Sequence, residues 1–314
     1  MASIKFKDIF LNESSTISSH NEKIDTKFTM EDFFDGENTS EDAEVKMQTA
    51  VLKDITKKQK IDFLISGELS NQLGISNRTL AKFGIPYMGV YNACASFPEA
   101  MIIAASILSS STLKNAAVLT SSHNLSVERT FRYPIEYGAP RKITQLFTAT
   151  GAVASTISKT KSNVKLESAT LGRIIDYGLK DANNMGAIMA PAAASTLQEH
   201  LKEMKRTVSY YDIILTGDLG KLGTELFKEI LSKNDITLKN HIDAGSNLIT
   251  DRTLTDQGAS GPVCLPLYLI EKILKEKKYK KILIIGTGSL QNQTLVNQKN
   301  TIPAIAHTVS LEVE

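Results

Sequence analysis

A repeated segment constrains the fold of this 314-residue chain more than any other feature of its sequence. Residues 61–69 and 211–219 match position by position: an apolar or aromatic residue, Asp, three apolar residues, a hydroxyl, Gly, an acid and Leu. A short apolar run that ends at glycine is typical of a buried parallel strand. The same offset brings the helical pattern of residues 43–55 onto that of residues 193–205.

A second pair of strand patterns is the third matched element of the repeat. Residues 116–122 and 282–288 each follow a long apolar helical pattern. Three elements in the same order indicate duplication of one βαβ-rich unit. We therefore predict an α/β fold in which two duplicated βαβ-rich halves pack as a layered α/β/α/β/α core. The predicted halves are residues 1–170 and 171–314. Residues 1–40 are polar and weakly periodic, and they predict a loop-rich arm that covers the core and could include one short strand.

Composition excludes several classes of protein. The 36 basic and 34 acidic residues leave a net charge of +2, and no basic cluster is apparent, so no nucleic-acid partner is expected. Two cysteines make no disulfide framework. The N-terminus lacks the apolar stretch of a signal peptide. The apolar region 83–113 is interrupted by two prolines and predicts a buried strand-turn-helix rather than a transmembrane segment. The protein is expected to be soluble or peripheral at a membrane.

Cys94 is the first candidate site residue, because it lies where a strand pattern gives way to the helical pattern of residues 100–108. Free N–H groups and the helix dipole at a helix start lower a thiol pKa and favour an anion. The alternative is a small buried hydrophobic residue. The second half opens a helix on a similar turn of small residues, 256–263, which contains Gly258. The two helix starts are expected to face one pocket.

Other polar residues could complete that pocket. His241 lies just before the second-half turn, and His123 and Asn124 follow a strand at the edge where α/β sheets collect ligands. Arg132 lies among aromatic residues and could hold a carboxylate with its guanidinium fork. Capping or solvated histidines, and a structural Glu–Arg pair, are the alternatives. Metal binding finds little support, because the calcium-loop-like segment 181–186 lacks a closing Glu.

Together these segments resemble the thiolase superfamily and, within it, the stage V sporulation protein AD family, from about residue 41 to the C-terminus. The resemblance is carried by residues 91–94, 121–124, 128–134, 148–152, 189–194, 215–219 and 301–307. It implies a thiolase-like fold in a non-catalytic protein that binds pyridine-2,6-dicarboxylate (dipicolinate). It also implies a part in calcium-dipicolinate uptake into the developing spore, alongside integral membrane proteins of the same operon at the spore inner membrane. Thiolase-type relatives commonly form homodimers.

A condensing enzyme of the β-ketoacyl-ACP synthase III type is the alternative that the resemblance leaves open. Such an acyltransferase needs a Cys nucleophile, a His and a further side chain that stabilises the oxyanion. Cys94 and His241 match the first two, and the resemblance places the third at Gly258, which has no side-chain donor. An inert scaffold for membrane partners is a third interpretation. Phe97 and Pro98 depart from the family pattern, and the bulk of Phe97 is expected to narrow the pocket.

The expected ligand site therefore comprises Cys94, His123, Asn124, Arg132, His241 and Gly258. No cofactor is expected, and calcium enters only as part of the ligand chelate.

Overall fold

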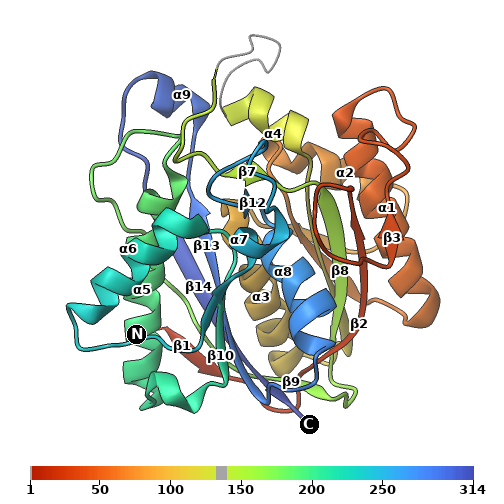
Figure 1. Cartoon of the computed structure of the whole chain (residues 1–314). Coiled ribbons are helices and arrows are strands. Elements are labelled where there is room, and N and C mark those ends of the chain that lie inside the picture. Colours follow the sequence, from red (N-terminus) through yellow and green to blue (C-terminus); the bar gives the residue numbers. More distant parts are fainter. Residues whose placement is uncertain (1, 132–139) are drawn as a thin grey trace.

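The computed structural model describes residues 2–131 and 140–314 and repeats one strand order twice (Figure 1). The first half has the order β5–β4–β6–β8–β2, and the second has β11–β10–β13–β14–β9. In each half the strands therefore stand in the order third, second, fourth, fifth, first. The first-half strands are β2 (Phe10–Ser18), β4 (Phe63–Gly67), β5 (Tyr87–Gly89), β6 (Asn115–Ser122) and β8 (Gly151–Ser158). Their counterparts are β9 (Val164–Thr170), β10 (Ile213–Thr216), β11 (His241–Asp243), β13 (Lys281–Ser289) and β14 (Ala304–Val313).

This order confirms the predicted α/β fold and its duplication. The matched segments 61–69 and 211–219 contain β4 and β10, and the matched segments 116–122 and 282–288 lie within β6 and β13. A short pairing of β2 with β9, at Leu11 and Val164, joins the halves into one hydrogen-bonded sheet. The small strands β1 (Ser3–Lys5) and β3 (Phe28–Thr29) pair with β9 and β2. The predicted division at residue 170 falls after β9, which in this strand order is the first strand of the second half.

The prediction of a loop-rich N-terminal arm is wrong. Residues 10–18 form β2, a nine-residue strand that pairs along β8. Hydroxyl residues hid this strand in the sequence, because Ser15, Thr16 and Ser18 are buried without contributing an apolar pattern. Buried hydroxyls are tolerated where they find hydrogen-bond partners, and Ser18 Oγ lies 3.0 Å from Thr26 Oγ1.

Helices cover the sheets in the predicted five layers (Figure 1). Helices α1 (Ser40–Lys58) and α2 (Gly74–Leu80) pack on the outer face of the first half. Helices α5 (Met185–Met204) and α6 (Gly220–Ser232) pack on the outer face of the second. Between the halves lie α3 (Ser96–Ser110), α8 (Cys264–Tyr268) and the π-helical segment Leu269–Leu274 that continues α8.

The central helix is apolar because strands of both halves surround it. The segment Ala93–Ser110 is long and apolar enough to cross a membrane by composition, but 61% of it is buried inside the protein, as in a core helix. Phe97 is fully buried in this core, so the expectation that its ring narrows a pocket is wrong. Pro98 packs so closely on Gly286 that a Cβ there would lie 2.3 Å from the proline ring.

Strand direction gives the molecule two distinct ends. Strands β5, β4 and β6 are parallel to one another, as are β11, β10 and β13. Beyond their carboxyl ends, β7 (Phe147–Thr148) pairs with β12 (Ala259–Ser260), so that loops of the two halves meet. In open α/β sheets ligands bind at this carboxyl edge.

Candidate functional site

A cavity of about 270 Å³ lies at the carboxyl edge and is lined by residues of both halves. Its polar lining comprises Tyr91, Asn92, Thr148, Ser260, Gln291 and Asn292, together with Ser289. Its apolar lining comprises Leu69, Ala93, Val127, Phe131, Met185 and Leu290. Cys94 completes the wall, so every lining residue in the described part of the chain is uncharged. Apolar walls with a few convergent polar groups are typical of a small-molecule site.

Cys94 reaches the cavity through a tight turn. It lies in the 3₁₀ turn Ala93–Ala95, which leads directly into α3. Ala93 adopts the left-handed conformation, with φ of 50°, which is uncommon for a residue with a side chain. Such strain persists only where the surroundings impose it. The turn leaves Cys94 buried, with 8% of its surface exposed, and in contact with the backbone N–H of Gly261.

The acidity predicted for Cys94 is wrong in direction. Burial raises the pKa of its thiol well above the ordinary value, and the charge of Asp218, which contacts the thiol, raises it further. The N–H of Gly261 lowers the pKa, but it is the smallest of these influences. Because the thiolate is the nucleophilic form, Cys94 is a poorly activated nucleophile at neutral pH.

Asp218 is the site residue that sequence reasoning missed. It is 1% exposed, and its Oδ1 accepts a hydrogen bond of 2.6 Å from Thr287 Oγ1. Burial raises its pKa to about 7, whereas its contacts with Cys94 and Thr287 lower it. The repeat contained a usable signal, since each copy of the strand ends in an acid at the carboxyl edge: Glu68 in the first half and Asp218 in the second.

Glu68 and Glu44 form a buried pair of acidic residues in the first half. Glu68 Oε1 accepts hydrogen bonds from Ser70 Oγ at 2.7 Å and from the backbone N–H of Ile75 at 3.2 Å. Glu44 lies near it and accepts from Ser121 Oγ at 2.6 Å. Burial, followed by the charge of Glu68, raises the pKa of Glu44 to about 8. Burial is also the largest cause of the raised pKa of Glu68. A buried carboxyl pair therefore stands behind the cavity wall near Leu69.

The structure does not bring His241 to the cavity. Its Nε2 lies 2.9 Å from Thr216 Oγ1, and its ring packs against Phe227 of α6, on the outer face of the sheet. Burial lowers its pKa to about 3. In a strand, neighbouring side chains point to opposite faces, and Ile242 is the residue that faces the central layer.

His123 and Asn124 stand behind the cavity wall. The His123 ring is fully buried beside Phe33, with Nε2 2.9 Å from the Phe33 carbonyl oxygen, and burial lowers its pKa. Asn124 donates from Nδ2 to the carbonyl oxygen of Thr148 at 3.2 Å and so supports a lining residue. Neither residue lines the cavity. Arg132 lies outside the described residues.

Gly258 is a packing requirement. It has φ of +114°, and a Cβ there would lie 2.6 Å from the carbonyl oxygen of Gly245 and 2.7 Å from Cα of Ser246. It is absent from the cavity lining, whereas Ser260, two residues later, is present. In the described parts of the chain, no three His, Cys, Asp or Glu side chains gather as metal ligands.

Comparisons with known proteins agree on family and fold. The family model for Stage V sporulation protein AD (SpoVAD) matches residues 16–312. Stage V sporulation protein AD of Bacillus subtilis (strain 168) is 37% identical over 270 residues, which cover 85% of this chain and 80% of that protein.

Solved condensing enzymes share the architecture at low identity. The 3-oxoacyl-[acyl-carrier-protein] synthase III of Aquifex aeolicus VF5 superposes with a TM-score of 0.62 at 13% identity, covering 97% of this chain and 99% of that one. A variant of Xanthomonas campestris OleA superposes with a TM-score of 0.67 at 13% identity, covering 98% of each chain. Likeness at this identity shows the thiolase-like fold alone.

Proposed function

Because the chain belongs to the stage V sporulation protein AD family, we propose that it is a non-catalytic protein whose cavity binds dipicolinate during calcium-dipicolinate uptake into the developing spore. In this role it works at the spore inner membrane with integral membrane partners. The main support for ligand binding is the cavity of about 270 Å³, which has an uncharged lining that includes Cys94.

The state of Cys94 argues against acyl transfer. A condensing enzyme activates its cysteine with a neighbouring base or a positive charge. Here the neighbour is the carboxyl group of Asp218, which raises the thiol pKa. His241 makes its hydrogen bond with Thr216 on the outer face of the sheet and is absent from the lining. We therefore assign Cys94 to the wall of a binding site.

The lining suits a flat aromatic ring with polar groups on its rim. Apolar side chains such as Val127, Met185 and Leu290 can cover ring faces. Amide and hydroxyl groups, such as those of Asn92 and Gln291, can donate to carboxylate oxygens. Dipicolinate presents one pyridine ring and two carboxylates, which this division of the lining matches.

Charge favours the calcium chelate over the free dianion. In the described residues no cation lines the cavity, and the buried acids Asp218 and Glu68 stand behind its walls. Burying a dianion there without a counter-charge would be costly. Calcium prefers oxygen ligands, and one ion on the two carboxylates cancels the ligand charge. Calcium then enters as part of the ligand.

Calorimetric titration tests this proposal directly. The purified chain is titrated with dipicolinate alone, with equimolar calcium and dipicolinate, and with calcium alone. Isophthalate with calcium is the matched control, because it has the same shape without the ring nitrogen that completes the chelate. We expect the calcium-dipicolinate mixture to bind most tightly and isophthalate much more weakly. The absence of heat with millimolar dipicolinate, with and without calcium, would contradict the proposal.

A separate measurement addresses the acyltransferase alternative. Incubation with acetyl-CoA followed by intact-mass spectrometry is expected to leave the chain unmodified. A stable acetyl adduct on Cys94 would overturn the non-catalytic assignment, whatever the titration shows.

A further inference from the structure

The end of the molecule opposite the cavity carries an excess of lysine. The amino ends of the parallel strands, the β8–β9 hairpin and the C-terminal residues meet there, at the lower end of Figure 1. We call this surface the basic face and define it as residues 57–62, 111–115, 159–165, 208–212, 275–281 and 312–314. These segments contain twelve lysines and five acidic residues, a net charge of +7 in a chain whose total is +2.

Backbone hydrogen bonds join these segments into one surface. The N–H of Asp62 donates to the carbonyl oxygen of Asn115, and the N–H of Lys159 donates to that of Lys114. Near the C-terminus, the N–H of Glu314 donates to the carbonyl oxygen of Asn163, and the N–H of Val313 donates to the carbonyl oxygen of Lys280. The N–H of Asp212 donates to Lys281 and closes the series. The lysines are therefore displayed together although they come from segments far apart in sequence.

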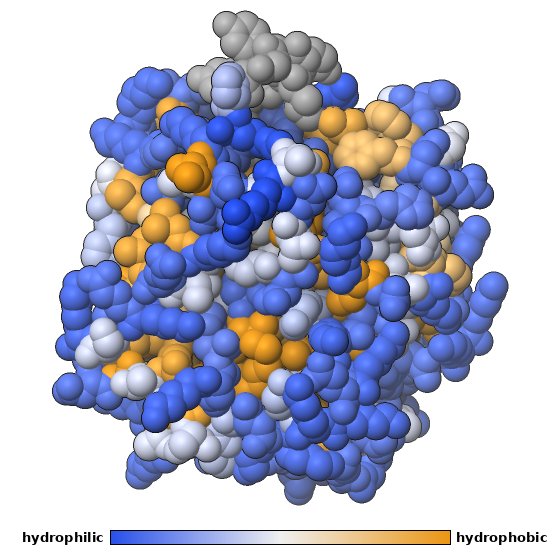
Figure 2. All heavy atoms as spheres, in the orientation of Figure 1, coloured by the Kyte–Doolittle hydropathy of each residue, from blue (hydrophilic) through white to orange (hydrophobic). Residues whose placement is uncertain are grey.

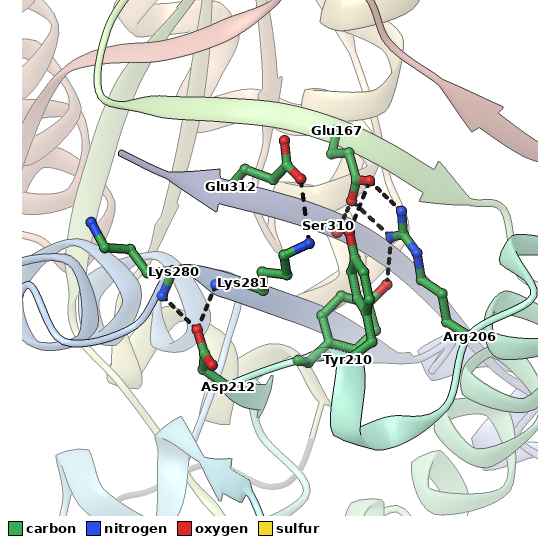
Figure 3. Close-up of polar contacts among 9 residues, drawn as sticks. Glu167, Arg206, Tyr210, Asp212, Lys280, Lys281, Ser310 and Glu312 are labelled. Atoms are coloured by element: carbon green, nitrogen blue, oxygen red, sulfur yellow. Dashed lines mark hydrogen bonds and ion pairs between the residues drawn. The ribbon is translucent and has the colours of Figure 1, made fainter.

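The duplicated aspartates hold two of the lysine loops rigidly. Asp212 Oδ2 accepts hydrogen bonds from the backbone N–H groups of Lys280 and Lys281, at 2.6 and 2.8 Å (Figure 3). Asp62 Oδ2, its counterpart in the repeat, accepts from those of Lys114 and Asn115, at 2.9 and 3.0 Å. The hydrogen bonds lower the pKa of Asp62, and the charges of Lys60 and Lys114 lower it further, so this carboxylate offsets part of the nearby lysine charge.

Tyr210 fixes the edge of the same surface. Its ring lies between two cations, with Lys281 Nζ and the Arg206 guanidinium carbon each 3.9 Å from the ring centroid (Figure 3). Arg206 also pairs with Glu167, and Ser310 Oγ donates to the same carboxylate at 2.8 Å. Cation–π contacts of this kind orient a lysine that would otherwise sample many rotamers.

Six exposed lysines of the basic face keep their charge free of an ion-pair partner. Within residues 2–131 and 140–314, no ion pair involves Lys57, Lys60, Lys114, Lys159, Lys277 or Lys280, and all six are exposed. The run 275–281 holds five lysines in seven residues, so the sequence-based expectation of no basic cluster is wrong. Figure 2 shows predominantly hydrophilic residues along this lower edge.

We propose that the basic face docks the protein onto an anionic lipid bilayer. The basic face contains lysines and no arginine, and lysine acts as a compact point charge without the planar fork that reads a specific partner. Several lysine charges spread over one surface are the feature by which basic segments bind anionic membranes. The proposal rests on the membrane-side part of the proposed function and assigns it to a surface separate from the ligand cavity.

Vesicle sedimentation tests the proposal with the full chain. Vesicles of phosphatidylcholine with about 30 mol% phosphatidylglycerol are compared with vesicles of pure phosphatidylcholine. The anionic lipid gives the first set a negative surface potential. We expect binding to the anionic vesicles, release as salt shortens the Debye length, and no binding to neutral vesicles. The quadruple variant Lys57→Ala, Lys60→Ala, Lys277→Ala, Lys280→Ala breaks no ion pair and, at about 1 kcal/mol for each lysine, is expected to bind about a thousandfold more weakly.

A matched variant removes the same charge elsewhere. Lys23, Lys180, Lys221 and Lys228 are exposed, form no ion pair among the described residues, and lie outside the basic face. Their replacement by Ala is expected to keep vesicle binding within about twofold. Equal losses in both variants, or no binding of the unaltered chain to anionic vesicles, would overturn the proposal.

Duplex DNA provides the remaining comparison. Binding of DNA with the same lysine dependence, without vesicle binding, would reassign the basic face to nucleic acid and overturn the proposal. Dipicolinate titration of the quadruple variant is expected to match that of the unaltered chain. Because vesicle binding needs no dipicolinate, failure of the docking proposal and failure of the ligand proposal are distinguishable.

Discussion

The thiol of Cys94 faces the carboxyl group of Asp218, and each residue comes from a different half of the repeat. In this fold a cysteine at the start of the central helix has a natural route to activation through nearby N–H groups. The carboxyl group opposes that route, and burial of both groups strengthens the opposition. The reactivity of this thiol, the stability of the fold around it and the affinity of the cavity can each be measured.

Replacing Asp218 with Asn should make Cys94 more reactive. The change removes the negative charge that raises the thiol pKa and keeps the size of the side chain. A fall of one pKa unit gives about tenfold more thiolate, so alkylation by iodoacetamide at pH 7.5 should accelerate by about that factor. Intact-mass spectrometry over time measures the rate. Cys264 is fully buried, and a Cys264→Ala background limits the signal to one thiol. Equal rates in the two chains would show that Asp218 does not govern the thiol.

Replacing Gly258 with Ala should destabilise the fold. The new Cβ would meet the Gly245 carbonyl oxygen at 2.6 Å in a backbone with φ of +114°. We expect a loss of about 2–4 kcal/mol in the free energy of unfolding, measured in urea. Gly84→Ala is the matched control: its φ is also positive, at +63°, but nothing lies within 4 Å of the added Cβ. The control should lose only about 1 kcal/mol. Similar losses at both positions would mean that packing does not require Gly258.

Glu44 should make stability fall as the pH rises from 7 to 8.5. Its pKa is raised to about 8 in the folded chain, so the folded state holds a proton that the unfolded state has already released. The stability that this group contributes is fully present below its unfolded pKa and is lost as pH passes through the folded value. We expect a decrease of about 1 kcal/mol between pH 7 and 8.5 relative to Glu44→Gln, measured by urea unfolding. Parallel pH profiles for the two chains would contradict the raised pKa.

Tyr91 should contribute to ligand affinity without supporting the fold. Its side chain lines the cavity, and the residue is 48% exposed. Tyr91→Ala removes an aromatic face and should weaken calcium-dipicolinate binding by about tenfold, with the melting temperature nearly unchanged. Tyr177→Ala, at a 69% exposed tyrosine that is absent from the lining, should leave both quantities unchanged. Calorimetry and thermal unfolding provide the two measurements, and unaltered affinity in Tyr91→Ala would remove this residue from the site.

The duplicated architecture was predictable because the repeat preserves apolar patterns that each strand and helix needs. Matching β4 with β10, and β6 with β13, was enough to indicate two similar halves. The N-terminal strand β2 was missed because its buried positions are filled by serine and threonine. Thr16 Oγ1 donates to Glu271 and Ser18 Oγ lies near Thr26 Oγ1, and sequence periodicity does not register such side-chain hydrogen bonds.

The site was predictable at Cys94 and much less so around it. The helix start fixes where Cys94 lies, but its acidity depends on Asp218, which is distant in sequence. His241 was misjudged because a difference of one residue along a strand decides which face a side chain occupies. In the sequence Gly258 seemed to replace a side-chain hydrogen-bond donor. In the structure, glycine is required there because the backbone of Gly245 leaves no room for a Cβ. Such tertiary contacts have no local signature.

The common direction of the parallel strands places the cavity and the lysine-rich surface at opposite ends of the molecule. Strand β13 runs from the lysine-rich end at Lys281 to the cavity at Ser289. Nine residues at about 3.3 Å each separate the two ends by about 30 Å. If the cavity holds the ligand and the lysine-rich end touches a membrane, as proposed, ligand and membrane lie at opposite ends of the molecule. Delivery of the ligand to that membrane would then require a partner that reaches around the molecule, or a reorientation of the whole protein.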